Sequence, residues 1–222
     1  MRNIVSHIKP YATTRSFKKH TILLYQGEAP RAVHVVLDGV VKAYSINAAG
    51  EEQIVTFETK DDLFPAPWVF HKASTTLYYY EALTDVEVLT VPRDQFHTLI
   101  DESNDLRANL LDYFATSNAG LLMRITSLEQ SRAREKIMFT LYYLLFRYGR
   151  ETTPGIYVVE IKLTHSVIAS LIGLTRETTT NELSKLKVQK VLRYSTHQYA
   201  IDKAKLERLL GEDSFESLEI SR

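Results

Sequence analysis

Residues 163–192 read LTHSVIASLIGLTRETTTNELSKLKVQKVL, and this stretch decides the fold of the later part of the chain. Thr164 is a candidate N-cap for a short helix that would end at Gly173, because glycine suits the left-handed position after a helix. Thr175 would cap a second helix, whose first turns are polar. Two helices joined by a tight glycine turn form a helix-turn-helix, which predicts that the second helix enters the major groove of DNA.

Four side chains on the first turns of the second helix are candidates for reading bases. Arginine can donate two hydrogen bonds to guanine, a carboxylate can accept one from cytosine, and asparagine can pair with adenine. Lysines and capping threonines would contact phosphates. Solvated polar residues with no partner are the alternative. The predicted base-reading residues are Arg176, Glu177, Thr180 and Asn181, and the predicted phosphate-contacting residues are Thr164, Thr175, Thr178, Lys185 and Lys187.

The segments on either side of this motif suit a winged helix. Arg193–Ile201 reads RYSTHQYAI and predicts a short hairpin, with a closing helix over Ala204–Leu210. Before the motif, the sequence predicts an apolar helix over Glu135–Tyr148, a loop over Gly149–Gly155 and a strand over Ile156–Lys162.

A long helix without proline is predicted over Asn104–Gln130. Six of its residues recur at alternating spacings of three and four, which is a heptad seam with one asparagine that would fix the register. Such a seam predicts a homodimer, and packing of the helix against its own barrel is the alternative. The seam consists of Leu111, Phe114, Asn118, Leu121, Ile125 and Leu128.

Residues 20–91 predict short strands separated by glycine turns, which favours a barrel or sandwich. Asp38-Gly39 is a signal for a hairpin between two of them. A short helix is expected next, over Arg93–Ile100. The predicted strands are Thr21–Tyr25, Ala32–Leu37, Val40–Ile46, Gln53–Glu58, Leu77–Ala82 and Val86–Val91.

Composition argues against several classes of protein. The 222 residues include no cysteine, which excludes disulfides, thiolate metal sites and iron–sulfur clusters. The seven histidines are scattered and no catalytic set is visible, so we expect no metal, no cofactor and no enzyme activity. The sequence shows no secretory signal and no membrane span, which predicts a cytoplasmic protein. The 27 basic residues equal the 27 acidic ones, so any basic DNA-binding surface must be local.

The chain resembles the catabolite-activator and fumarate–nitrate regulator (Crp/Fnr) family of bacterial transcription regulators over most of its length. The matching motifs are YQGE at residues 25–28, VVLDGVVKAY at residues 35–44 and LTRET at residues 174–178. The resemblance implies an α+β fold with a β-roll or jelly-roll sensor domain, a dimerisation helix and a winged helix-turn-helix. The corresponding ranges are 1–103, 104–131 and 132–222.

The resemblance also implies a homodimer that binds double-stranded DNA at an inverted repeat and contacts RNA polymerase. Arg176 and Glu177 occupy positions that read bases in the family, whereas the third reading position is often arginine and here is Asn181. The alternative is a sensory protein whose β-roll binds a metabolite and whose C-terminal domain contacts protein.

Relatives that bind cyclic AMP hold its ribose with a Gly-Glu-Leu run and its phosphate with an Arg-Ser pair. Laid along this chain without gaps, these positions fall on Pro65–Pro67 and on Thr76-Leu77, and two polar positions of the long helix fall on Leu121 and Leu122. A buried phosphate without a cationic partner is strongly unfavourable, so we expect no response to cyclic AMP.

Apolar and aromatic residues stand in place of those polar groups. They predict either a pocket for an unknown apolar effector or a filled core, and aromatic side chains are more often packing than recognition. The residues concerned are Phe64, Trp68, Phe70, Tyr79, Leu121 and Leu122.

Overall fold

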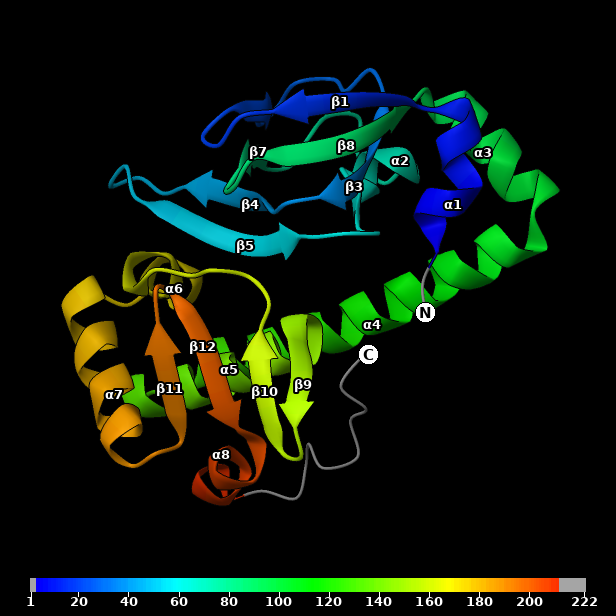
Figure 1. Cartoon of the computed structure of the whole chain (residues 1–222). Coiled ribbons are helices and arrows are strands. Elements are labelled where there is room, and N and C mark those ends of the chain that lie inside the picture. The colour runs from blue at the N-terminus through cyan, green and yellow to red at the C-terminus, as the bar shows by residue number, and fades with distance from the viewer. Residues whose placement is uncertain (1–2, 212–222) are drawn as a thin grey trace. The chain divides into compact units, whose positions relative to one another are not determined.

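The computed structural model describes residues 3–211, so the outermost residues of the predicted first and last domains (1–2 and 212–222) lie outside the described part. The chain divides into two compact units, the first ending at Ala115 and the second beginning at Thr116 (Figure 1). The boundary falls within the long helix α4 (Asn104–Glu129), so the two parts of this helix pack in different units.

Two four-stranded antiparallel sheets form the first unit, in the orders β1-β8-β3-β6 and β2-β7-β4-β5 (Figure 1). Two facing sheets confirm the sandwich that the short, evenly spaced strands allowed, and they agree with the β-roll that the family resemblance implied. The strands are β1 (Thr13–Phe17), β2 (Ile22–Leu24), β3 (Val33–Asp38), β4 (Val41–Ile46), β5 (Glu52–Glu58), β6 (Leu63–Phe64), β7 (Tyr79–Ala82) and β8 (Val86–Val91).

Strands β3 and β8 separate two hydrophobic cores. Val36 and Val88 belong to a core made by residues of both sheets. Val35 and Leu89 belong to a second core, shared with helices, because alternate residues of a strand point to opposite faces. The helices of the first unit are α1 (Ile4–Ile8), the 3-10 turn η1 (Lys9–Tyr11), α2 (Ala66–Val69), α3 (Arg93–Glu102) and the first part of α4.

The turn predicted at Asp38-Gly39 is present, but the predicted hairpin is wrong. Strand β3 pairs with β8 and β6, whereas β4 pairs with β5 and β7, so the turn carries the chain from one sheet to the other. Gly39 has a φ of +86°, and a Cβ atom there would lie 2.2 Å from the carbonyl oxygen of Asp85. The backbone N–H of Val40 donates to the Thr84 hydroxyl at 2.9 Å, which ties this turn to the β7–β8 turn.

The second unit contains helices around a four-stranded antiparallel sheet of order β11-β12-β10-β9. The predicted loop over Gly149–Gly155 is wrong for its first five residues, which form β9; the strand predicted over Ile156–Lys162 ends at Val159. The elements are α5 (Ala133–Tyr148), β9 (Gly149–Thr153), β10 (Ile156–Val159), α6 (His165–Ile172), α7 (Arg176–Val188), β11 (Leu192–Ser195), β12 (Gln198–Asp202) and α8 (Lys203–Leu210).

We expect Gly39→Ala to destabilise the first unit far more than Gly50→Ala. Both glycines have positive φ, which costs a residue with a Cβ about 1–2 kcal/mol, but only Gly39 also lies against backbone. The loss at Gly39 should therefore exceed about 3 kcal/mol, because the β7–β8 turn must move. Urea unfolding followed by the fluorescence of Trp68, the single tryptophan, measures both variants. Equal unfolding midpoints for the two variants would contradict this account.

Candidate nucleic-acid interface

Both helices of the predicted helix-turn-helix begin at the threonines expected to cap them. The Thr164 hydroxyl accepts a hydrogen bond from the backbone N–H of Val167 at 3.2 Å, and α6 begins at the next residue. The Thr175 hydroxyl accepts one from the N–H of Thr178 at 3.1 Å, and α7 begins at Arg176. These bonds satisfy N–H groups that a helix start leaves without an internal partner.

The turn between α6 and α7 depends on Gly173, whose φ of 66° and ψ of 36° place it in the left-handed region. The N–H of Gly173 donates to the carbonyl of Ala169, and the N–H of Leu174 donates to the same carbonyl at 3.1 Å. The structure therefore confirms both caps, the glycine turn and the second helix over the residues where the sequence predicts them.

Helix α7 buries one face and exposes the other. Thr179, Leu183 and Leu186 are buried at helical spacing. Arg176, Glu177 and Asn181, three of the predicted base-reading residues, are exposed, and they are called the reading face below. A hydrophobic face fixed in the domain leaves the reading face turned to solvent on the first two turns of the helix.

Thr180, the fourth predicted base-reading residue, lies differently. It is half-buried, and its hydroxyl is 2.9 Å from Nδ1 of His165, at the start of α6. The structure thus turns Thr180 toward α6, beside the reading face. His165 was not among the predicted site residues.

The predicted phosphate-contacting residues lie on and beside α7. The Thr175 hydroxyl donates to the Thr178 hydroxyl at 2.9 Å, which leaves the Thr178 proton free to point elsewhere. Lys185 forms an ion pair with Glu182, and Nζ of Lys187 lies 4.5 Å from the centre of the Tyr194 ring. Both lysines are exposed.

Strands β11 and β12 form the predicted hairpin, and the segment Leu192–Asp202 is the wing hairpin. Their register pairs Leu192 with Ile201 and Ser195 with Gln198, and Thr196 and His197 make the turn with positive φ. The hairpin of the predicted winged helix is confirmed, and α8 follows it as expected.

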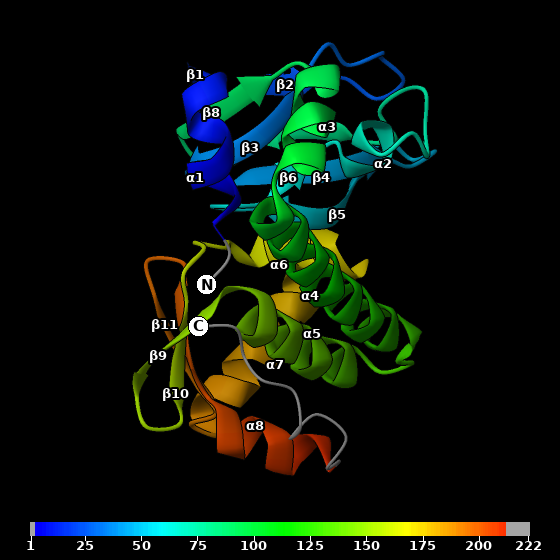
Figure 2. The same cartoon turned by 90° about the vertical axis from the view of Figure 1, so that its right-hand side faces the viewer.

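The heptad seam lies on the exposed side of α4. Leu111 is 72% exposed, Ile125 51%, and Leu128 42%; Phe114 is half-buried. The opposite side of the helix packs inside the units: Tyr113 belongs to the helix-side core of the first, and in the second α5 lies along α4 (Figure 2). The α4 stripe is the name used below for the exposed members of the seam together with the neighbouring exposed Leu122. It consists of Leu111, Asn118, Leu121, Leu122, Ile125 and Leu128.

Two domain families match the two units. Residues 14–103 match the cyclic nucleotide-binding domain, and residues 135–209 match the Crp-like helix-turn-helix domain. The chain belongs to the Crp/Fnr family of transcription regulators. The resemblance seen in the sequence motifs is confirmed.

Individual relatives are distant but span most of the chain. The HTH-type transcriptional regulator ArcR of Staphylococcus haemolyticus is 26% identical over 189 residues, which cover 85% of this chain and 82% of the relative. The global nitrogen regulator of a Synechocystis strain is 27% identical over 187 residues, 84% of this chain and 82% of its own. The structure of FixK2 from Bradyrhizobium japonicum has a TM-score of 0.73 at 22% identity, covering 89% of this chain and 96% of that one, and shows the same fold.

The β-roll of this Crp/Fnr member is filled between its sheets by three stacked rings. Phe64 is fully buried, with its ring centre 5.2 Å from that of His34 and 5.0 Å from that of Tyr80. Burial, together with the charge of Arg15, lowers the pKa of His34 to about 4, so this imidazole is neutral at pH 7. His34 therefore offers no positive charge to a phosphate.

The other residues of the predicted apolar site do not gather around Phe64. Trp68 lies in the helix-side core, with Arg93 over its ring at 4.4 Å, and Phe70 packs against that same core. Tyr79 stacks on Tyr44 at 5.2 Å. Leu121 and Leu122 are 49% and 57% exposed on the part of α4 that belongs to the second unit.

The positions on which the cyclic-AMP-holding groups were predicted to fall have other roles in this structure. Pro65 is the N-cap of α2, and Ala66 begins that helix. Thr76 is buried, and its hydroxyl donates to the carbonyl of Tyr25. Leu77 is 46% exposed. These side chains offer no cation to a phosphate.

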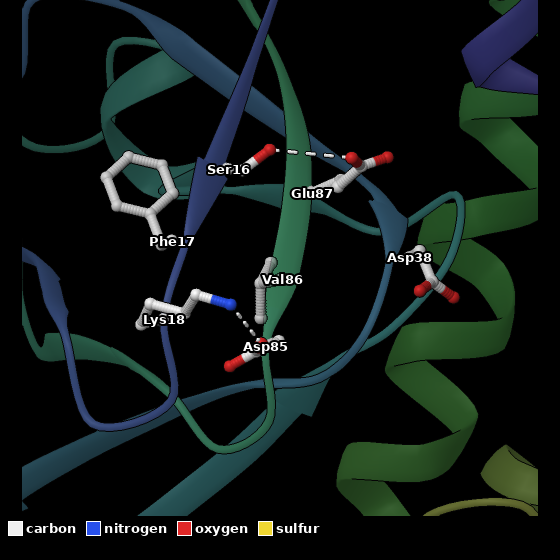
Figure 3. Close-up of a pocket in the computed structure, with 7 residues that line it drawn as sticks. All are labelled: Ser16, Phe17, Lys18, Asp38, Asp85, Val86 and Glu87. Carbon is white, nitrogen blue, oxygen red and sulfur yellow. Dashed lines mark hydrogen bonds and ion pairs between the residues drawn. The ribbon is translucent and has the colours of Figure 1, made fainter.

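The first unit has an open cleft of about 360 Å³ at the ends of β1 and β8, and none of the predicted site residues lines it (Figure 3). Lys18 reaches across it to Asp85 at 2.8 Å, and the Ser16 hydroxyl faces Glu87 (Figure 3). This hydrogen bond to Asp85 raises the pKa of Lys18. The ammonium group of Lys18 is thus already paired with the carboxylate of Asp85.

Residues 3–211 contain neither a candidate metal site nor a candidate membrane span. Over that range, no group of three or more histidine, aspartate or glutamate side chains is placed to hold a metal ion. Within the same range, no helix combines the length and apolar character needed to cross a membrane.

Proposed function

We propose that this chain is a dimeric transcription regulator that binds an inverted-repeat DNA site with α7 in the major groove. The observation that carries the proposal is the reading face: Arg176, Glu177 and Asn181 are exposed on the first two turns of a capped helix whose other side is buried core. A helix of this kind fits the major groove, and its N-terminal residues reach base edges.

Each residue of the reading face suits a particular base. Arg176 can donate two hydrogen bonds to O6 and N7 of guanine, and Glu177 can accept one from N4 of cytosine. Asn181 can pair with N6 and N7 of adenine, whereas the arginine common in the family at this position would favour guanine. The preferred site should therefore differ from those of arginine-bearing relatives at the base facing Asn181.

Phosphate contacts would come from the residues around the reading face. The hydroxyl of Thr178 and the ammonium groups of Lys185 and Lys187 are the candidates, and the N-terminus of α6 at Thr164 adds a positive helix end. These contacts position the domain without reading sequence, and they make binding dependent on salt.

Two chains would pair through the α4 stripe. Its leucine and isoleucine side chains are 42–72% exposed in one chain, and a second copy of the helix would remove them from water. Asn118 within the stripe would hold the two helices in register. A two-fold dimer presents two identical helices, so half-sites should be inverted and centred about 10–11 base pairs apart, or a small multiple of that.

The β-roll would not bind cyclic AMP, because Phe64 and its partners pack between its sheets. Its buried Lys42 is already paired with Glu52 and Glu81. The same packing disfavours an apolar effector between the sheets. Contact with RNA polymerase and action in the cytoplasm stay predictions from the family and the sequence.

Selection from random DNA tests the proposed readout. Wild type should select an inverted repeat, and Asn181→Arg should select a different base at one position of each half-site. Arg176→Ala should cost about 1–3 kcal/mol at its own base pair. As the control, Lys187→Ala should weaken all sequences alike and lower the salt slope by about one. An Asn181→Arg protein that selects the wild-type site would show that Asn181 does not read DNA.

The double change Leu121→Asp and Ile125→Asp should give a monomer. Each carboxylate would have to lose its water in the proposed interface, which is strongly unfavourable without a partner. Analytical ultracentrifugation at micromolar concentration measures the mass, and far-UV circular dichroism checks the fold. Glu129→Asp, on the same helix outside the stripe, is the control and should stay dimeric. A wild-type protein that sediments as a monomer would contradict the dimer.

Cyclic AMP should neither bind nor alter DNA affinity. Isothermal titration calorimetry at millimolar nucleotide should give no binding heat, and the affinity for the selected DNA should not change. A micromolar dissociation constant, or a large gain in DNA affinity, would overturn the argument from the filled β-roll.

A further inference from the structure

Four side chains join α6, α7 and the wing hairpin in one cluster. Nδ1 of His165 is 2.9 Å from the Thr180 hydroxyl, and its ring meets Tyr194 edge-on with centres 5.2 Å apart. Tyr199 lies beside both rings, 6.4 Å from that of His165 and 5.4 Å from that of Tyr194. His165 is the first residue of α6, directly after its cap at Thr164.

This cluster holds α7 at the level of the reading face. Thr180 lies next to Asn181 and one turn after Arg176, so a hydrogen bond at Thr180 restricts rotation of the turns that carry both residues. The ring contacts restrain the wing hairpin through Tyr194, which also carries Lys187 against its ring. His165 therefore links α7, through the Thr180 hydroxyl, to the hairpin, through the two tyrosine rings.

The charges facing His165 disfavour its protonated form. Burial, then the charges of His197 in the hairpin turn and of Arg176 on α7, lower the pKa of His165. Tyr194 and Tyr199 face it from β11 and β12, and burial raises the pKa of Tyr199, so Tyr199 brings no negative charge at neutral pH. The lowered pKa favours the neutral imidazole at pH 7 in the free protein, where the guanidinium of Arg176 and two aromatic rings surround it.

DNA would supply the missing negative charge. Phosphates that approach the N-terminus of α6 and the hairpin would offset the charges of Arg176 and His197 and favour an imidazolium at the helix start. Because the Thr180 hydroxyl can donate or accept, the bond to Nδ1 persists in either protonation state.

We propose that His165 is a positioning residue for the recognition helix and that its imidazole takes up a proton when the domain closes on the phosphate backbone. This inference rests on the proposed function. A group whose pKa is higher in the complex than in the free protein makes binding tighter at low pH. The gain is complete below the free pKa and is lost as the pH rises through the pKa of the complex.

The test measures the affinity of the full-length protein for its selected DNA at pH 7.5, 6.5 and 5.5 and constant ionic strength. His165 and His197 are the only histidines after residue 115, so His197→Gln serves as the background in which His165 is the one histidine of the second unit. In that background, affinity should rise toward pH 5.5, by about tenfold for each unit by which DNA raises the pKa of one imidazole. Adding His165→Asn, which keeps a polar atom near the place of Nδ1, should abolish most of this rise.

A second pair of variants tests positioning apart from charge. Thr180→Ser keeps the hydroxyl and should keep the selected base opposite Asn181, whereas Thr180→Val has the same shape without it and should relax that preference. The ¹³Cε1 shift of His165, titrated with and without DNA, reports its protonation directly. Circular dichroism at each pH confirms that the variants are folded.

The outcomes separate this inference from the proposed function. Equal affinity for the selected site at all three pH values would overturn proton uptake by His165 and leave the proposed function intact. A pH dependence that survives His165→Asn would do the same. Equal preferences in Thr180→Ser and Thr180→Val overturn the positioning role. A wild-type protein that binds no DNA at pH 7.5 overturns both proposals.

Discussion

Burial of one face of α7 is the constraint on which the rest of the interface depends. Leu183 and Leu186 are fully buried, and burying a leucine contributes about 1.5–3 kcal/mol, far more than any single exposed polar contact on this helix. A shift of one residue would rotate the helix by about 100° and expose both leucines. The core thereby determines that Arg176 and Asn181 point to solvent, and the caps at either side of Gly173 determine where the helix begins.

Helix α4 also has one buried and one exposed side, but its exposed side carries large apolar side chains. Toward α5, Gly120 permits close approach, since a Cβ there would lie 2.8 Å from the side chain of Arg147. Further along, Ser127 and Thr140 share a buried hydrogen bond at 2.6 Å. These contacts fix the rotation of this part of α4 within its unit and leave the α4 stripe exposed. The proposed readout and the proposed pairing thus both follow from which faces of the two helices are buried in the cores.

The sequence predicted elements wherever a local signal agreed with the buried face. Both threonine caps, Gly173 and the wing hairpin carry such signals, and all were placed correctly. Strands β1 and β9 could not be found, because their side chains are mostly exposed and give no alternating apolar pattern. The Asp38-Gly39 pair signals a turn but not where the chain goes afterwards, which depends on the β7–β8 turn packed against it. The contact between His165 and Thr180 joins positions 15 residues apart and has no local pattern to reveal it.

The filled β-roll changes what the proposed regulator can respond to. A ligand alters DNA binding only through a difference in its affinity for two states. A core packed with Phe64, Tyr80 and the neutral His34 gives a charged nucleotide no such difference. In the proposed function, two equilibria remain: association of chains through the α4 stripe, and neutralisation of phosphates around α7. The first varies with protein concentration and the second with salt, and His165 would add protons to the second. A regulator built this way answers to its own abundance and to its ionic surroundings, because the groups that set both equilibria lie on exposed helix faces while the sensor core is packed.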